Sequence, residues 1–357
     1  MANLPLNIDY TGKVVVVTGA GGLICGAMAR AFAQSGAKVA ALDLNEDAVK
    51  ALANELKAEG YICEGYKANV LEPEALEAVH QAVLADLGPC DILVNGAGGN
   101  NPRATTDNEY QHEAKEGGKS FFDLDAGGVD FVFKLNFQGT LLPTQAFAKD
   151  MVAKKAGCIL NISSMNAYTP LTKIPAYSAA KAGISNFTQW LATHFAGTGI
   201  RCNAIAPGFL VSAQNKALLF NDDGTPTARS AKILNGTPTG RFVDADELLG
   251  ATLFLCDDKA ASAITGVVLP VDAGFAAYSG VSLLIKNLRL KSRRFFCYFF
   301  FRNARQAISM TAAGTSAARK MLALGTNEVV PSLLTMVWAL ASTALPMNGP
   351  TTPGTST

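Results

Sequence analysis

A run of β-branched residues near the N-terminus, followed at once by a glycine-rich turn, constrains the fold most strongly. Residues 13–17 read Lys-Val-Val-Val-Val without polar alternation, which is typical of a strand buried on both faces of a parallel sheet. Apolar residues then recur at helical spacing up to Gly36, and a second short apolar run, residues 38–42, ends at Asp43. This order of strand, turn, helix and strand predicts a βαβ unit.

The same alternation continues through the first 280 residues, and no internal repeat or low-complexity linker interrupts it. Seven strands that alternate with helices predict the α/β class, with a Rossmann-type, doubly wound, seven-stranded parallel sheet in a single domain. A ligand of such a sheet lies at the carboxyl ends of the strands. Further helices are expected at residues 46–58 and 72–87, and further strands at residues 61–67, 91–94, 158–162, 200–205 and 267–271.

Charge separates the chain into two parts near Val281. The 357 residues are nearly neutral overall, with 30 Lys and Arg against 29 Asp and Glu. Residues 281–357 nevertheless hold nine cations and one anion, whereas residues 1–280 hold 21 cations and 28 anions. We therefore expect a domain over residues 1–280 and a separate extension after it. The overall balance excludes a protein that coats nucleic acid or an anionic membrane along its whole surface.

The seven cysteines are scattered, and most lie in apolar runs, as Cys158 does. Because no C-x-x-C pair or Cys/His cluster occurs, we expect no metal site. Buried, reduced thiols are the expected state. Residues 1–13 lack the basic opening and the apolar stretch of a signal peptide, so the sequence favours a cytoplasmic location.

The glycine-rich turn over residues 18–26 is the first candidate binding site. Its glycines let the backbone approach a pyrophosphate, and the N-terminus of the following helix supplies N–H donors. A tight turn without a ligand needs similar residues, but the strand before it and the helix after it favour a dinucleotide. Asp43 follows Gly19 by 24 residues, where a carboxylate accepts hydrogen bonds from both adenosine ribose hydroxyls and repels a 2′-phosphate. The sequence thus favours NAD over NADP, although Asp43 is also suited to cap the next helix.

A tyrosine and a lysine four residues apart form the second candidate group. Tyr177 and Lys181 share one face of a helix, where an ammonium brings the phenol, of ordinary pKa ~10, closer to the range of a general base. Such a pair is more often a solvated helix face. Ser164 ends a predicted strand and could polarise a carbonyl or cap a helix, with Ser163 as a competitor. Asn136 lies in an apolar helix, where it could bond backbone carbonyls, hold a water chain or serve a structural role only.

Residues 10–280 resemble the short-chain dehydrogenase/reductase family. The resemblance rests on the four residues just named, in their order and spacing, and on two loops, Asn95-Gly96-Ala97-Gly98 and Asn203-Ala204-Ile205-Ala206-Pro207-Gly208. It implies an NAD-binding catalytic domain that acts on CH–OH groups by hydride transfer. In it, Tyr177 is the acid/base and Lys181 lowers the pKa of Tyr177 and binds the nicotinamide ribose. Ser164 orients the substrate oxygen, Asn136 supports a proton relay, and the assembly is a homotetramer.

The resemblance also implies a set of cofactor-binding residues along the turn and the strand ends. In the usual family turn, glycines stand where this chain has Leu23 and Cys25, and Asn69 replaces a usual Asp. Asn keeps one hydrogen-bond acceptor, so Asn69 in place of the usual Asp is tolerable. The implied set is Gly19, Gly22, Leu23, Ile24, Asp43, Asn69, Val70, Asn95, Ala97, Gly98, Tyr177, Lys181, Pro207 and Gly208.

A long polar segment between Asn95 and Asn136 points to the substrate. It carries amide, hydroxyl and guanidinium groups suited to a polyhydroxylated anion, although a solvated surface loop has a similar composition. With residues 163–167 and 173–177, this insertion resembles the D-mannonate oxidoreductase (fructuronate reductase) branch of the family. That branch implies reversible hydride transfer between NADH and the C5 ketone of D-fructuronate. The expected substrate-binding residues are Arg103, as a carboxylate ligand, with Ser164, Asn166 and Tyr177.

The sequence leaves two other functions open. Another carbohydrate reductase or a 3-oxoacyl reductase would use the same catalytic residues, and the polar insertion argues against a tunnel for an acyl chain. A catalytically silent NAD-binding regulator is the non-enzyme alternative. Residues 209–240 are expected to cover the substrate as a lid.

The last 77 residues continue beyond the point at which the resemblance ends. Residues 295–301 hold six aromatics in seven positions beside arginines, and residues 329–345 are apolar but interrupted by polar residues and a proline. A peripheral membrane anchor would use such residues, but neither stretch has clean helical periodicity. We expect residues 281–357 to be a non-native or disordered extension, as a frameshift or read-through would produce.

Overall fold

The computed structural model describes residues 8–212 and 215–280. The chain divides into two units, Met1–Gly280 and Val281–Thr357. The expectation that the second unit is non-native or disordered therefore lies outside the described residues. All statements below concern the first unit.

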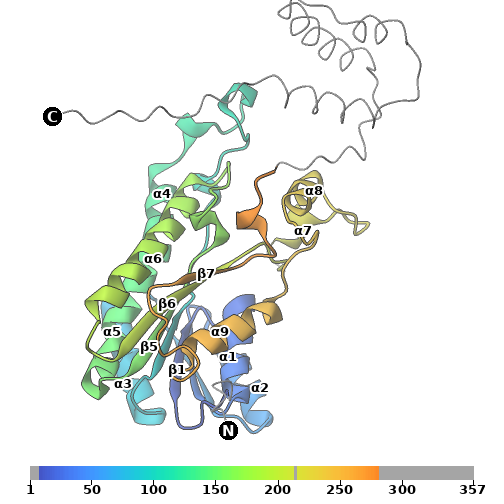
Figure 1. The fold of residues 1–357 in the computed structure, drawn as a ribbon. Coiled ribbons are helices and arrows are strands. Elements are labelled where there is room, and N and C mark those ends of the chain that lie inside the picture. Colours follow the sequence, from blue (N-terminus) through green and yellow to red (C-terminus); the bar gives the residue numbers. More distant parts are fainter. Residues whose placement is uncertain (1–7, 213–214, 281–357) are drawn as a thin grey trace, which may run out of the picture. The chain divides into compact units, whose positions relative to one another are not determined.

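Seven parallel strands form one sheet in the order β3-β2-β1-β4-β5-β6-β7, which confirms the predicted doubly wound architecture (Figure 1). The direction of the crossovers reverses between β1 and β4, so a crevice is expected beyond the carboxyl ends of these two strands. The strands are β1 (Val14–Thr18), β2 (Lys38–Asp43), β3 (Cys63–Lys67), β4 (Ile92–Asn95), β5 (Gly157–Ile162), β6 (Ile200–Pro207) and β7 (Val268–Val271).

Helices cover both faces of the sheet (Figure 1). One face packs against α1 (Leu23–Gln34), α2 (Glu46–Ala58) and α9 (Leu249–Cys256), and the other against α3 (Pro73–Asp86), α5 (Gly139–Lys154) and α6 (Pro175–His194). Three further helices, α4 (Ala126–Phe133), α7 (Lys216–Leu219) and α8 (Ala228–Asn235), lie towards the same end of the sheet (Figure 1).

The β-branched run of β1 is explained by the two cores that it separates. Val15 and Val17 point into the layer that contains Phe32 of α1, whereas Val14 and Val16 point into the layer that contains Phe147 of α5. Every residue of β1 is buried, so no position on this strand favours a polar side chain. Complete burial of each valine contributes roughly 1.5–3 kcal/mol, which fixes β1 at the centre of the sheet.

Six of the seven cysteines belong to the described residues, and all six are buried free thiols. The expected burial is thus confirmed for those six, whereas Cys297 lies outside the described residues. Within residues 8–212 and 215–280, no three His, Cys, Asp or Glu side chains gather as a metal site would require. Among the same residues, no helix is long and apolar enough to cross a membrane.

Candidate active site

The glycine-rich turn connects β1 to α1 and closes tightly against the loop after β4. Gly19 has a φ of 72°, in the left-handed region that favours glycine, and a Cβ there would lie 2.9 Å from the Ala97 nitrogen. Gly22 is the N-cap residue of α1, whose first turn contains no acidic residue and receives no side-chain cap. The N–H groups at this helix start can therefore serve an anion.

Asp43 is tied to the turn rather than to the start of the next helix. Its Oδ2 accepts a hydrogen bond from the Gly21 nitrogen at 3.0 Å, and its Oδ1 accepts one from the Asn45 nitrogen at 2.8 Å. Asn45, and not Asp43, is the N-cap of α2 and accepts from the Ala48 nitrogen. The alternative interpretation of Asp43 as a helix cap is therefore wrong. Its carboxylate lies beside the glycine-rich turn, as a ribose ligand requires.

The two departures from the usual glycine pattern differ in their surroundings. Leu23 is 50% exposed, so its side chain points away from the core of the turn. Cys25 is buried under Gly96, where a Cβ on Gly96 would lie only 2.0 Å from the Cys25 Sγ. Burial raises the pKa of Cys25 to about 12, which keeps it a neutral thiol. Because Gly96 has no side chain, it leaves the space that the Cys25 side chain fills.

The loop after β4 is held to β1 by a threonine that sequence reasoning missed. The Thr18 Oγ1 accepts hydrogen bonds from the Gly96 nitrogen at 3.0 Å and from the Ala97 nitrogen at 3.3 Å. Thr18 is completely buried. Its position at the last residue of a buried strand, directly before Gly19, was the signal available in the sequence.

Asn136 lies on a π-helical turn, Lys134–Gln138, between α4 and α5. Its Nδ2 donates to the Gly99 oxygen at 2.7 Å and to the Val132 oxygen at 2.8 Å, and its Oδ1 accepts from the Gly99 nitrogen at 3.2 Å. The side chain is completely buried. Of the roles considered for Asn136, bonding to backbone carbonyls is the one that the structure contains. This side chain locks the loop after β4 to the helix.

Lys181, Asn136 and Gly98 converge at one point. A Cβ on Gly98 would lie 2.7 Å from the Asn136 Oδ1 and 3.3 Å from the Lys181 Nζ. The ammonium donates to the Ile162 oxygen at 2.8 Å and lies 5.7 Å from the centre of the Tyr177 ring. Burial lowers the pKa of Lys181 from 10.5 to about 8. The missing side chain at Gly98 keeps the space between these polar groups open.

The pKa of Tyr177 shifts in the opposite direction from the one expected. Lys181 was expected to lower the pKa of this phenol, whereas burial raises the pKa in the structure and the Ser164 hydroxyl opposes the rise. Lys181 does not counter this rise, because its ammonium donates to the Ile162 oxygen rather than to the phenol. Tyr177 and Lys181 nevertheless lie on one face of α6, as their spacing predicts.

The structure separates the two serines at the end of β5. The Ser163 hydroxyl is engaged with α6, through the Lys181 oxygen at 3.2 Å and the Ser185 hydroxyl at 2.7 Å. Ser164 caps a short 3-10 helix, Met165–Ala167, by accepting from the Asn166 nitrogen at 3.2 Å. Its hydroxyl also lowers the pKa of Tyr177, against the effect of burial. Ser164 is thus the serine next to the phenol. The buried Asn166 Oδ1 has no hydrogen-bond partner among the described residues.

Two other expected cofactor positions lie at strand ends. Asn69 bonds locally, with Nδ2 donating to Glu72 at 2.8 Å and Oδ1 accepting from the Leu71 nitrogen at 3.1 Å. Val70 is buried, and a Cβ on Gly139 would lie 3.1 Å from its Cγ2. The carboxamide of Asn69 therefore shapes the turn before α3.

Pro207 and Gly208 are expected cofactor positions at the end of β6. Pro207 pairs with Val271 of β7, and the Gly208 nitrogen donates to the Val271 oxygen at 3.0 Å. A Cβ on Gly208 would lie 2.6 Å from the Asp272 Cα, so only glycine fits there without movement. This backbone segment is fixed at the carboxyl edge of the sheet, where the family resemblance expects the nicotinamide.

Arg103 lies in the insertion and is paired with Asp125, which sequence reasoning missed. The Arg103 Nε donates to the Asp125 Oδ1 at 2.9 Å, Nη2 donates to the same oxygen, and the guanidinium lowers the pKa of Asp125. Asp125 is the N-cap of α4, and an Asp directly before an apolar helix was the available signal. Two of the donors of Arg103 are thus already used.

The insertion contacts the segment that was expected to act as a lid. Lys232 of α8 forms an ion pair with Glu109 of the insertion at 2.8 Å. The Lys173 Nζ donates to the Asp107 oxygen at 2.7 Å, which connects the insertion to the residues before α6. Residues 213–214, at the start of the expected lid, lie outside the described residues.

Comparison with known proteins places this geometry in a family. The family model for short chain dehydrogenase matches residues 13–222. An uncharacterized oxidoreductase of Haemophilus influenzae is 57% identical over 280 residues, which are 78% of this chain and 98% of the relative. D-threitol dehydrogenase of Mycolicibacterium smegmatis is 34% identical over 275 residues, which are 76% of this chain and 96% of the relative.

A solved structure extends the similarity to three dimensions. It is the crystal structure of a Haemophilus influenzae protein proposed to be a D-mannonate oxidoreductase, with bound NAD. It matches with 57% identity and a TM-score of 0.75, and the match covers 78% of this chain and 100% of that one. The order of the seven strands among the described residues agrees with this similarity in fold. The chain belongs to the short-chain dehydrogenase/reductase family of oxidoreductases.

Proposed function

We propose that the chain is an NAD-dependent oxidoreductase that interconverts D-fructuronate and D-mannonate. The observation that carries the activity is the convergence of Gly98, Asn136 and Lys181 at the carboxyl ends of the central strands. The substrate is supported by the 57% identity to a protein proposed to be a D-mannonate oxidoreductase, and by the polar insertion.

NAD fits the residues of the turn. The N-terminus of α1 offers uncapped N–H groups for a pyrophosphate, and the Asp43 carboxylate lies next to the turn, where a 2′-phosphate would be repelled. The open space at Gly98 lies against Lys181, which suits a nicotinamide ribose. When bound, NAD accepts or supplies the hydride at the substrate carbon.

Each polar side chain has a defined task in the proposed reaction. Tyr177 gives its proton to the oxygen of the ketone as that oxygen gains negative charge, and the Ser164 hydroxyl orients the same oxygen. The Lys181 ammonium stabilises the phenolate that remains, which is favoured once the ammonium turns from the Ile162 oxygen towards the phenol. Asn136 holds the loop at Gly99 in place beside these groups.

Arg103 remains our candidate for binding the substrate carboxylate. Its Nε and Nη2 each use one N–H on Asp125, so both N–H groups of Nη1 and the second N–H of Nη2 remain for a bidentate carboxylate. Arg103→Lys should raise the KM for the sugar acid well beyond any effect on the KM for NADH. The Asn166 carboxamide oxygen is a second candidate, suited to a substrate hydroxyl. Equal effects of Arg103→Lys on both KM values would contradict the assignment.

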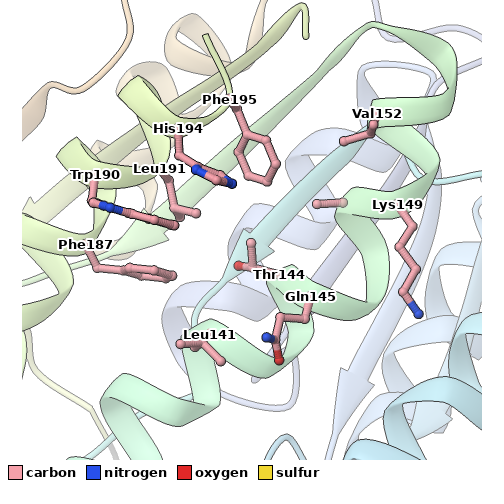
Figure 2. A pocket seen from close by; sticks show the side chains of 11 residues that line it. Leu141, Thr144, Gln145, Lys149, Val152, Phe187, Trp190, Leu191, His194 and Phe195 are labelled. Atoms are coloured by element: carbon pink, nitrogen blue, oxygen red, sulfur yellow. The ribbon is translucent and has the colours of Figure 1, made fainter.

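A homotetramer in the cytoplasm remains a prediction. An apolar groove of about 730 Å³ runs between α5 and α6, with Phe187, Trp190 and Phe195 on one side and Leu141 on the other (Figure 2). Trp190 is 52% exposed, and a second copy packed there would remove this surface from water. Trp190→Glu should then lower the mass measured by light scattering after size-exclusion chromatography. An unchanged mass would exclude the groove as the contact.

The test of the function is NADH oxidation by the purified full chain with D-fructuronate. NADPH, a 3-oxoacyl substrate and a neutral ketose are the comparisons, and Tyr177→Phe is the blank. We expect NADH-dependent turnover of D-fructuronate above all others. Turnover of another carbohydrate, which the similarity to D-threitol dehydrogenase favours as second candidate, would keep the family and reject the substrate. Binding of NADH without any turnover would favour a regulator.

A further inference from the structure

Four buried polar side chains cross the layer between the sheet and the helices α5 and α6. Asn95 and Asn161 lie at facing positions of β4 and β5, and Thr144 and Thr188 lie on α5 and α6. The exposed fraction of each side chain is at most 3%. None of the four belongs to the expected catalytic or substrate-binding set, and only Asn95 belongs to the expected cofactor set.

These side chains form one continuous chain of hydrogen bonds. The Asn95 Nδ2 donates to the Thr144 Oγ1 and to the Asn161 Oδ1, both at 2.9 Å. The Asn161 Nδ2 donates to the Thr188 Oγ1, also at 2.9 Å. We call this group of four side chains the Asn–Thr bridge. Figure 2 shows Thr144 on α5, where the bridge reaches the groove between the two helices.

On the α5 side, the bridge leads to the catalytic region. The Thr144 hydroxyl donates to the Thr140 oxygen at 2.8 Å, and the Thr140 hydroxyl donates to the Asn136 oxygen at 2.9 Å. The Asn95–Thr144 hydrogen bond thus holds α5 to β4, and the two threonine hydrogen bonds within the helix lead from there back to Asn136.

On the α6 side, the bridge reaches the helix that carries the phenol and the ammonium. Thr188 lies seven residues after Lys181, which is about two helical turns and therefore the same face. Its hydroxyl donates to the Ile184 oxygen at 2.8 Å. Asn161 itself lies three residues before Ser164 on the same strand segment. Tyr177 and Lys181 therefore sit on α6, which the bridge joins to the sheet, and Asn136 and Ser164 lie next to two further joined elements, α5 and β5.

The surroundings of the bridge are apolar, which makes its polarity informative. The same layer contains Leu93, Phe147, Ile159 and Leu191, all buried. Apolar side chains of similar volume would fill this layer without the cost of burying amides and hydroxyls. Directional hydrogen bonds fix a spacing between elements more narrowly than apolar contacts do, although the Asn95 Oδ1 has no hydrogen-bond partner among the described residues.

From this geometry we infer that Asn161 and Thr188 are positioning residues for catalysis. Through the Asn–Thr bridge they fix α6 relative to α5, and so fix Lys181 and Tyr177 relative to Asn136. This inference rests on the proposed function only in that it assumes a reaction at Tyr177, and it is independent of the substrate.

The test uses two replacements of Thr188 with opposite losses. Thr188→Val keeps the shape and loses the hydroxyl, whereas Thr188→Ser keeps the hydroxyl and loses a methyl group. A misplacement of reacting groups by about 1 Å costs on the order of 100-fold in rate. We expect Thr188→Val to have a smaller effect and to lower kcat by about tenfold. Thr188→Ser should retain most of kcat. Thr252→Val on α9 is the matched control, because Thr252 is completely buried and its hydroxyl has no partner among the described residues.

A second measurement does not depend on the substrate. The Kd for NADH, followed by nicotinamide fluorescence from about pH 6 to about pH 10, senses the protonation of Lys181 next to the ribose. Its pH midpoint should move in Thr188→Val and in Asn161→Leu, and not in Thr188→Ser or Thr252→Val. If fructuronate is not the substrate, this midpoint still moves.

Two outcomes would overturn the inference. In the first, Thr188→Ser is impaired more than Thr188→Val, which would mean that Thr188 acts by packing. In the second, Thr188→Val loses thermal stability while kcat and the pH midpoint stay at wild-type values, which would mean that the bridge stabilises the fold only.

Discussion

Replacing Gly96 with alanine tests whether the Cys25 thiol occupies the space under the loop after β4. A Cβ at this position would lie 2.0 Å from the Cys25 Sγ and 3.0 Å from the Thr18 oxygen. Optimal contact between such atoms is about 3.5–4.0 Å, so one side must move by about 1.5 Å. Overpacking of this kind costs about 1–3 kcal/mol. We expect about 3 kcal/mol for Gly96→Ala, because a strand and a helix lie on the two sides.

The partner replacement, Cys25→Ala, isolates the clash. Its Cβ would lie 3.5 Å from a Cβ on residue 96, which is an ordinary contact. Alone, it removes one buried sulfur and should cost about 1 kcal/mol. The double variant should cost about 2 kcal/mol rather than the sum of about 4, which gives a coupling free energy of about 2 kcal/mol.

Urea unfolding followed by far-UV circular dichroism measures these differences, and an NADH titration of each variant shows whether binding follows stability. Gly250→Ala is the control, since a Cβ on Gly250 meets nothing within 4 Å. It should be neutral or stabilising by about 0.4–1 kcal/mol, because Gly250 lies inside a helix. Costs of Gly96→Ala and Cys25→Ala that add to within about 0.5 kcal/mol would refute the argument.

Three further predictions concern the catalytic groups. Tyr177→Phe should lower kcat by about 10²–10⁴-fold while the Kd for NADH stays within about threefold, and steady-state kinetics with nicotinamide fluorescence would detect a failure of either half. Asp43→Ser should raise kcat/KM with NADPH relative to NADH by about tenfold or more, whereas Asp47→Ser, on the first turn of α2, should not; a preference that stays unchanged contradicts the role of Asp43. Because burial lowers the pKa of Lys181 from 10.5 to about 8, the unfolded chain binds more protons in this window, so the free energy of unfolding should rise with pH between these values. Lys181→Met should flatten that rise, and parallel pH curves for the two proteins would argue against it.

The order of elements and the candidate catalytic residues were predictable because they depend on local sequence. The valines of β1 indicated a strand buried on both faces, and the spacing of Tyr177 and Lys181 placed them on one helix face. The family resemblance then supplied roles for Ser164 and Asn136, and the family itself is confirmed by the matching model and relatives.

What escaped prediction depends on which distant residues meet. The family resemblance selected Ser164, but the role of Ser163 required the position of α6, because the Ser163 hydroxyl donates to the Lys181 oxygen. Asp125 lies 22 residues from Arg103, and no local pattern indicates that they pair. The pKa of Tyr177 likewise depends on burial and on the direction of the Lys181 ammonium, which spacing alone does not give.

The π-helical turn at Lys134–Gln138 makes the chain sensitive to length where it looks most like an ordinary helix. A π turn accommodates one residue more than an α turn, so α4 and α5 form one rod with a shift in phase. Deleting a residue there would rotate one half of the rod against the other by about 100°.

Both halves of this rod are already fixed by their neighbours. Val132 is buried on the α4 side, and Thr140 and Thr144 are buried on the α5 side. A single-residue deletion would therefore have to turn Asn136 away from Gly99, although the sheet itself would be untouched. Among related sequences, gaps should accumulate in the loops of the insertion and be absent from residues 134–138.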